Sequence, residues 1–281
     1  MGFLLNRLTV LRAYAEELVR HGCPRDEDPD APVTLFLLDG VGGWQFAPLM
    51  IRRVLRQAGT RAHTVLFNWH AGLRGDLLTD LMWRRKNEVA ACRLARDIRA
   101  LQRRTPDRSI HLAAYSGGCG VAVFAAERLR EDRPIASMLL LAPAISPTYD
   151  LTAALSRVQR CVVGVSRRDR FLLGVGTRLF GTIDRVRTVS AGQSGFVIPR
   201  PSDPDCADAY RRLQQVHWQP GWSARHHHGG HTGWINPRFL AAQLPHLMPL
   251  HASQTPHPAD PRPQVLDTDP RCQESDFFRA P

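Results

Sequence analysis

The sequence predicts an α/β protein with a mostly parallel central sheet and helices on both faces. The first observation is a set of apolar runs of strand length that have no polar face, at residues 33–38, 135–142 and 161–166. Strands of this kind are typical of parallel sheets whose two faces are both covered. The second observation is that segments of helical periodicity alternate with these runs, and this alternation is the pattern of repeated strand–helix–strand units.

The chain has 281 residues, of which 43% are hydrophobic and 22% charged, as in an ordinary soluble domain. This length can bury one sizeable core. We expect an N-terminal helix and linker over residues 1–30 and the α/β domain over residues 31–250. Residues 251–281 are rich in proline and poor in apolar side chains, so we expect a disordered tail.

The expected elements can be placed in order from the spacing of apolar residues and from glycine and proline punctuation. Residues 3–20 repeat apolar side chains every three or four positions, which predicts an amphipathic helix followed by a proline-rich link over residues 21–32. The remaining elements are a strand at 33–38, a helix at 45–57, a strand at 64–69, a loop at 71–80, a helix at 86–103, a strand beginning at 110, a helix at 117–130, strands at 135–142 and 161–166, and a helix beginning at Pro237 after the N-cap residue Asn236.

The formal net charge is +11, and the basic residues are 36 arginines and one lysine, Lys86. The arginines are spread along the chain and match no nucleic-acid-binding motif, so we expect no nucleic-acid partner. No apolar stretch reaches the roughly 18 residues of a spanning helix, so we expect no membrane-spanning segment. The six cysteines form no Cys-x-x-Cys pair and no secretory leader is recognisable, which favours a reducing, cytoplasmic location. The oligomeric state is left open.

A glycine-rich loop, Asp39-Gly40-Val41-Gly42-Gly43, follows the strand at 33–38 and precedes a helix. Such a loop can bind a dinucleotide or a phosphate. However, the Gly-x-Gly-x-x-Gly pattern needs a third glycine where Gln45 stands, and no Gly-Lys-Ser/Thr is present. We therefore expect no nucleotide cofactor.

Ser116 stands at the turn between the strand that begins at 110 and the helix at 117–130, within Ala114-Tyr115-Ser116-Gly117-Gly118. The small residues two before and two after Ser116 suit a sharp strand-to-helix turn. This stretch resembles the nucleophile elbow Gly-x-Ser-x-Gly of the α/β-hydrolase family, with alanine at the first glycine position. The resemblance covers about residues 33–250.

The resemblance implies an acid and a histidine that follow the serine in the chain. Asp169 comes just after the strand at 161–166, where the family places its acid, and Asp150 and Asp184 are rivals. His231, in Gly-Gly-His-Thr-Gly, is similar to the family's catalytic-histidine loop. The implied oxyanion hole is formed by the backbone N–H groups of Val41 and Gly117.

The implied function is that of a serine hydrolase, which needs no cofactor and cleaves an ester, a thioester or a similar acyl bond of a small molecule. Asp39 stands where the family usually has a histidine, and a carboxylate there would disfavour the oxyanion. One alternative is therefore a binding protein of this fold without turnover. The glycine-rich, apolar segment 170–200 could form a lid or a surface excursion packed on the sheet.

A second alternative is a metal-dependent hydrolase that uses the histidine cluster His226, His228 and His231. Neighbouring histidines tend to point apart, and the metalloprotease spacing His-Glu-x-x-His is absent. No Asp or Glu lies within residues 209–259 to complete such a site. We therefore favour the serine chemistry and expect no metal.

Overall fold

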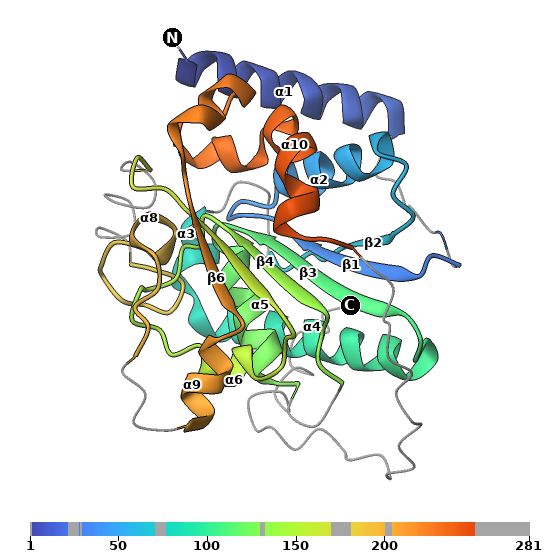
Figure 1. The fold of residues 1–281 in the computed structure, drawn as a ribbon, viewed down its shortest axis with the longest axis vertical. Coiled ribbons are helices and arrows are strands. Elements are labelled where there is room, and N and C mark those ends of the chain that lie inside the picture. Colours follow the sequence, from blue (N-terminus) through green and yellow to red (C-terminus); the bar gives the residue numbers. More distant parts are fainter. Residues whose placement is uncertain are drawn as a thin grey trace.

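A six-stranded, all-parallel sheet forms the centre of the protein in a computed structural model (Figure 1), with strand order β2-β1-β3-β4-β5-β6. The strands are β1 (Val33–Leu38), β2 (His63–Leu66), β3 (Ser109–Tyr115), β4 (Ser137–Leu141), β5 (Cys161–Val165) and β6 (Leu213–His217). The structure describes residues 2–21, 28, 30–70, 77–129, 133–169, 181–199 and 204–250. The sheet confirms the predicted fold class.

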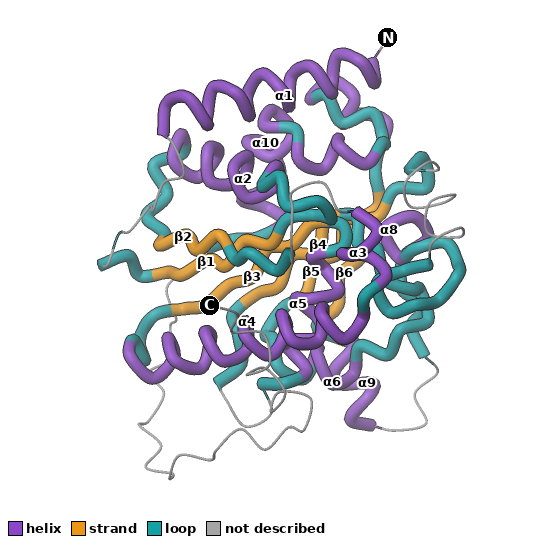
Figure 2. Tube along the Cα trace, turned by 180° about the vertical axis from the view of Figure 1, so that it is seen from behind, coloured by secondary structure: helices purple, strands orange, loops and turns teal. Residues whose placement is uncertain are grey.

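Helices cover the two faces of the sheet in two outer layers (Figure 2). On one face lie α2 (Phe46–Gln57) and α10 (Pro237–Leu247), with α1 (Gly2–His21) packed outside them. The other contains α4 (Arg84–Arg104), α5 (Gly118–Glu127), α6 (Thr152–Leu155) and α9 (Pro204–Tyr210). The shorter α3 (Leu77–Met82), α8 (Ala191–Ser194) and the 3-10 helices η2 (Pro220–Arg225) and η3 (His231–Ile235) complete the described elements.

The strands are apolar on both sides because each face of the sheet carries its own hydrophobic cluster. All residues of β1, β3, β4 and β5 are buried. Along β3, Leu112 and Ala114 belong to the cluster under α4 and α5, whereas Ala113 and Tyr115 belong to the cluster under α2 and α10. Burying a side chain the size of leucine contributes about 1.5–3 kcal/mol. The two clusters therefore hold the ends of the strands in fixed register.

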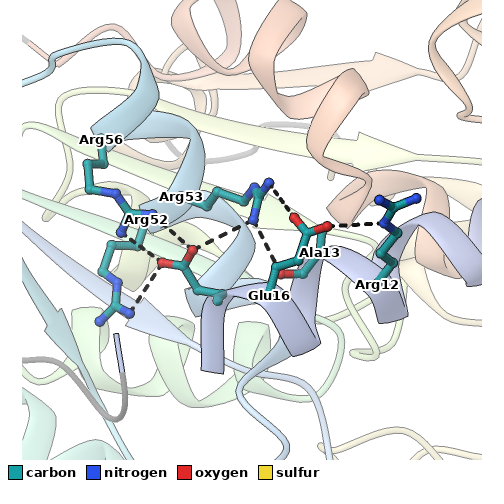
Figure 3. Close-up of polar contacts among 7 residues, drawn as sticks. Arg12, Ala13, Glu16, Arg52, Arg53 and Arg56 are labelled. Carbon is teal, nitrogen blue, oxygen red and sulfur yellow. Dashed lines mark hydrogen bonds and ion pairs between the residues drawn. The ribbon is translucent and has the colours of Figure 1, made fainter. Parts of the chain in front are cut away.

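The N-terminal helix α1 is held on α2 by an ion-pair network (Figure 3). The carboxylate of Glu17, fully buried, lies 3.5 Å from the buried guanidinium of Arg52 and accepts two hydrogen bonds, at 2.8 and 2.9 Å, from Arg56. Arg53 binds Glu16 at 3.0 Å. A buried carboxylate needs such partners to remain charged. Helix α1 is thus packed against α2 of the α/β domain.

Most predicted elements match the structure to within three residues at their boundaries, whereas β6 and several short helices, among them α3, α6, α8 and α9, were not predicted. Residues 71–80, expected to be a loop, include α3 from Leu77 onward, and residues 71–76 lie outside the described residues. Strand β6 was not expected because its sequence, Leu-Gln-Gln-Val-His, is half polar. It lies at the edge of the sheet, where exposed polar side chains are tolerated.

The segment 170–200 is described from residue 181 to residue 199, and there it packs on the sheet. Ile183 is fully buried, and its N–H donates to the carbonyl oxygen of Ala144 at 2.9 Å. Residues 170–180, and the tail expected at 251–281, lie outside the described residues. Within the described ranges, none of the helices combines the length and the apolar character needed to cross a bilayer.

Candidate active site

Ser116 occupies the turn between β3 and α5, at the carboxyl edge of the sheet. Its φ of 52° is in the left-handed region, which is uncommon for a residue with a side chain and marks a strained turn. The turn is fixed by two hydrogen bonds with the next strand and the loop after it. The Ser116 N–H donates to Leu141 at 2.9 Å, and the Ser116 carbonyl accepts from Ala144 at 3.1 Å. Ser116 is buried, with 7% of its surface exposed.

His231 begins the 3-10 helix η3, which follows β6 and the loop 226–230. The indole ring of Trp234 fixes this helix against β5, because Gly164 leaves room for it: a β-carbon on Gly164 would lie 2.7 Å from the ring. The loop is also held from β5, since the Ser166 hydroxyl donates to the carbonyl oxygen of Gly229 at 2.5 Å. Both contacts bring His231 to the carboxyl end of the sheet.

The three residues that the sequence singled out lie in one hydrogen-bonded line. The Nε2 atom of His231 is 2.9 Å from the Ser116 hydroxyl, and its Nδ1 atom is 2.6 Å from Oδ2 of Asp169. Asp169 is 3% exposed and the His231 side chain 9% exposed. Because a carboxylate only accepts hydrogen bonds, the proton on neutral His231 is on Nδ1, which leaves Nε2 as the acceptor for the serine proton.

The other carboxylates considered for the acid lie in different places. Asp150 is exposed and accepts hydrogen bonds from the backbone N–H and hydroxyl of Thr152, at 2.9 and 2.6 Å. Asp184 accepts the N–H of Ser146 at 2.9 Å. Both therefore fix backbone, whereas Asp169 is the one of the three that contacts His231.

Val41 and Gly117, whose N–H groups are the two expected oxyanion donors, are neighbouring residues. A β-carbon on Gly117 would lie 2.8 Å from Cγ1 of Val41, and one on Gly40 would lie 3.2 Å from Cβ of Ser116. Neither the Val41 nor the Gly117 N–H donates to another group of the described chain. Free backbone donors beside a serine hydroxyl can bind an oxyanion.

Asp39 does not direct its carboxylate at these donors. Oδ1 accepts the N–H of Ala47 at 3.0 Å and Oδ2 the N–H of Phe46 at 3.2 Å, so the side chain occupies the N-terminus of α2. Complete burial raises the pKa of Asp39, and the hydrogen bonds from Ala47, Gly40 and Phe46 oppose that rise. Helix N-termini favour such an acceptor. The Asp39 carboxylate is thus bound to the first turn of α2.

The histidine cluster does not converge on one point. His226 is 2.7 Å from Arg238, whereas both ring nitrogens of His231 face Ser116 and Asp169. His227 is buried among aromatic rings, and its desolvation lowers its pKa to about 3. The described part of the chain contains no group of three or more metal-ligating side chains. The alternative based on His226, His228 and His231 therefore has no supporting geometry there.

Sequence reasoning missed a buried polar cluster beside the glycine-rich loop 39–43, formed by Asp80, His70 and Lys86. Asp80 lies in α3, in the stretch that we expected to be a loop. The signal that could have found the cluster is Lys86, the single lysine among 36 arginines.

The described cysteines include both free thiols and a disulfide-bonded residue. Cys119 and Cys161 are buried free thiols and Cys206 is a partly exposed one. Cys92 on α4 is disulfide-bonded. A reducing, cytoplasmic environment therefore stays a prediction.

Comparison with solved structures found similar folds at low sequence identity. A lipase-esterase related protein from Clostridium acetobutylicum is 9% identical, with 79% of this chain and 96% of that chain covered and a TM-score of 0.43. An esterase from Pyrobaculum calidifontis is 12% identical, with coverages of 87% and 92% and a TM-score of 0.40. A thioesterase of the prodiginine biosynthetic pathway in Streptomyces coelicolor is 16% identical, with coverages of 79% and 88% and a TM-score of 0.39.

No curated protein sequence matches the chain. A family model described as "Alpha/beta hydrolase of unknown function (DUF900)" matches residues 43–196, which is more than half of the chain. The matched range includes Ser116 and Asp169 and ends before His231. With the parallel sheet and the strand–turn–helix at Ser116 already in place, the protein belongs to this α/β-hydrolase family.

Proposed function

We propose that the protein is a serine hydrolase that cleaves an ester, a thioester or a similar acyl bond of a small molecule. The observation that carries the proposal is the line of hydrogen bonds from Ser116 through His231 to Asp169, at 2.9 and 2.6 Å. A serine hydroxyl is a weak nucleophile unless a base accepts its proton, and this arrangement supplies that base together with a group that orients it.

In the proposed reaction, Oγ of Ser116 attacks the carbonyl carbon while its proton moves to Nε2 of His231. The buried carboxylate of Asp169 stabilises the imidazolium that results. The carbonyl π electrons move to oxygen, and the oxyanion is bound by the N–H groups of Val41 and Gly117. Collapse of this tetrahedral species breaks the bond to the leaving group, which takes the proton from His231 and leaves an acyl group on Ser116.

Water completes the cycle by the same route. His231 accepts a proton from a water molecule, whose oxygen attacks the acyl carbonyl, and then returns that proton to Oγ of Ser116. The products are the acid and the free enzyme. Loss of one oxyanion donor typically costs about 3 kcal/mol of barrier lowering, so the placement of Val41 and Gly117 matters as much as the nucleophile.

A binding protein without turnover remains the alternative from a different functional class. This alternative rests on Asp39 and on the arginines around Asp169. The Asp39 carboxylate binds the N–H groups of Phe46 and Ala47, and the Asp169 carboxylate binds Nδ1 of His231. This geometry favours turnover, because it leaves the donors at Val41 and Gly117 available.

Labelling with a fluorophosphonate, combined with hydrolysis of p-nitrophenyl acetate and butyrate, separates these functions. We expect the probe to modify Ser116, as mapped by peptide mass spectrometry, and we expect Ser116→Ala to lose both labelling and hydrolysis. Ser156→Ala is the matched control and should keep both, since Ser156 is exposed after α6 and its hydroxyl donates to the carbonyl oxygen of Ala153. A folded wild-type protein that neither reacts with the probe nor turns over the esters would contradict the proposal and leave the binding function.

A further inference from the structure

The polar cluster of Asp80, His70 and Lys86 is hydrogen-bonded directly to the loop of residues 40–45, called the oxyanion loop below because it carries the Val41 N–H. Asp80 is 2% exposed, and its Oδ2 accepts the backbone N–H of Gly42 at 2.8 Å. The same oxygen contacts Nδ1 of His70, and Oδ1 contacts the ammonium group of Lys86. A buried carboxylate with three charged or polar partners is expensive to assemble and is expected to have a defined role.

The charges in this cluster are balanced around an ionised carboxylate. Burial acts to raise the pKa of Asp80, but the hydrogen bonds from His70, Lys86 and the Gly42 N–H outweigh it, so its pKa lies below the usual value. The ionised group accepts only, so His70 donates through Nδ1. The Lys86 side chain is 9% exposed, so its ammonium group is largely removed from water beside the Asp80 carboxylate.

The loop that Asp80 binds has an unusual backbone. Gly42, Gly43 and Gln45 have φ values of 94°, 67° and 62°, all in the left-handed region. Such a loop holds one conformation only if its surroundings determine it. Asp39 binds the end of the loop through the N–H groups at the start of α2, and Asp80 binds its middle through Gly42.

Trp69 extends the cluster to both sides of the oxyanion hole. Nζ of Lys86 lies 4.9 Å from the centre of the Trp69 ring, and the indole N–H donates to the carbonyl oxygen of Asp39 at 2.9 Å. The far edge of the ring lies 3.4 Å from the place that a β-carbon on Gly117 would occupy. Lys86 and Trp69 thus support the segments that carry both donor N–H groups.

We propose that Asp80, held by Lys86 and His70, is a positioning residue that fixes the peptide units around Val41 and Gly42, so that the Val41 N–H points at the developing oxyanion. The inference rests on the proposed function for its catalytic part. Asp80 acts through the Gly42 N–H and does not touch the substrate.

Two measurements test the proposal, one of the loop and one of catalysis. The first is hydrogen–deuterium exchange of peptides that cover residues 40–47, and the second is kcat and KM for p-nitrophenyl butyrate. Both are made on the full chain with Asp80→Asn, Lys86→Met and Lys86→Arg. Asp208→Asn is the matched control, because it removes an exposed carboxylate that binds two arginines on the surface.

In Asp80→Asn and Lys86→Met we expect exchange in the loop to become at least about 10-fold faster, and kcat to fall by about 10- to 100-fold, somewhat less than the loss of a donor itself. We expect KM to change by less than about 3-fold, because the donors act mainly on the transition state. Lys86→Arg keeps the positive charge and should recover most of kcat. If Asp80→Asn does not fold, the comparison of Lys86→Met with Lys86→Arg carries the test.

Each of the other possible outcomes would contradict a specific part of the proposal. Faster loop exchange with unchanged kcat, in protein that labels at Ser116, refutes a positioning role while the proposed function stands. A rise in KM alone refutes action through the transition state. Unchanged hydrogen–deuterium exchange over residues 40–47 refutes the statement that Asp80 holds the loop through the Gly42 N–H. A wild-type protein without esterase activity or labelling refutes the proposed function and the catalytic part of this inference. The exchange data then test separately whether Asp80 holds the loop.

Discussion

Gly118, the first residue of α5, lies so close to Asp39 that a β-carbon on Gly118 would be 2.3 Å from the Asp39 carbonyl oxygen. The obstacle is backbone, and Trp69 also binds that oxygen, so it cannot move aside easily. The elbow at Ser116 and the oxyanion loop that starts after Asp39 can therefore approach each other only because residue 118 has no side chain.

Replacing this glycine should affect stability and activity together. We expect Gly118→Ala to lower the free energy of unfolding by about 1–3 kcal/mol, the usual range for overpacking, and to reduce kcat by separating Ser116 from the loop. Urea unfolding and p-nitrophenyl butyrate kinetics measure the two effects. Gly221→Ala is the control, since a β-carbon there would have no neighbour within 4 Å. A Gly118→Ala variant as stable and active as the control would show that the contact relaxes.

Removing the charge of Asp169 should reduce turnover far more than binding. Asparagine in its place can present an N–H to Nδ1 of His231 and so favour the wrong tautomer, with the proton on Nε2. We expect kcat to fall by about 10³- to 10⁴-fold with a small change in KM. Steady-state kinetics on Asp169→Asn and on the exposed Asp150→Asn provide the comparison. Equal activity in these two variants would mean that Asp169 is not the acid.

The buried pair of Glu17 and Arg52 should be costly to break from one side. In Glu17→Met, the buried guanidinium of Arg52 loses its carboxylate, and we expect a loss of about 3–5 kcal/mol in unfolding free energy. The double variant Glu17→Met/Arg52→Met removes both charges and should be more stable than Glu17→Met alone. Chemical denaturation of the wild type, of the single variants Glu17→Met and Arg52→Met, and of the double variant gives the coupling energy. Additive effects would show that α1 does not depend on this pair.

His227 should make the protein sensitive to mild acid. Its folded-state pKa of about 3 lies below the unfolded value of about 6.5, so the unfolded chain binds the proton more strongly. The stability it contributes is complete above about pH 6.5 and is lost as the pH falls toward 3. At pH 5 the loss should be about 2 kcal/mol relative to pH 7.5.

Urea unfolding at the two pH values tests this sensitivity. The variant His227→Phe places an apolar ring among Trp222, Trp234 and Phe239. Between pH 7.5 and pH 5, its free energy of unfolding should fall by about 2 kcal/mol less than that of the wild type. The exposed His246→Gln should behave as the wild type. An identical pH dependence in His227→Phe and wild type would assign the acid sensitivity to other groups.

The apolar strands and the elbow could be predicted from sequence because local pattern and tertiary environment agree there. Val33–Leu38 has no polar face and lies between two neighbours in the sheet. Asn236 and Pro237 begin α10 as predicted, and the Asn236 side chain accepts the N–H of Arg238 at 2.9 Å. Cap and apolar pattern are local signals, so they need no knowledge of distant contacts.

Contacts between distant segments could not be predicted in the same way. The residues next to Asp39 in the sequence do not show whether its carboxylate faces the oxyanion hole or the first turn of α2. The direction of the carboxylate depends on the path of the backbone over residues 40–45. The link from Asp80 to Gly42 spans 38 residues and depends on α3, which glycines on its N-terminal side concealed. Strand β6 was missed because an edge strand needs few apolar residues.

The position of His231 after β6 has a consequence for the order in which the protein matures. Ser116 follows β3, a strand in the middle of the sheet, whereas His231 follows β6, which lies at the edge of the sheet beside β5. The serine and the histidine are 115 residues apart in the chain. Parallel sheets with such long-range pairings form slowly. Under the proposed function, Ser116 of a newly made chain has no base beside it until β6 has paired with β5. The fraction of chains that a fluorophosphonate labels at Ser116 would therefore measure the fraction that has completed the sheet.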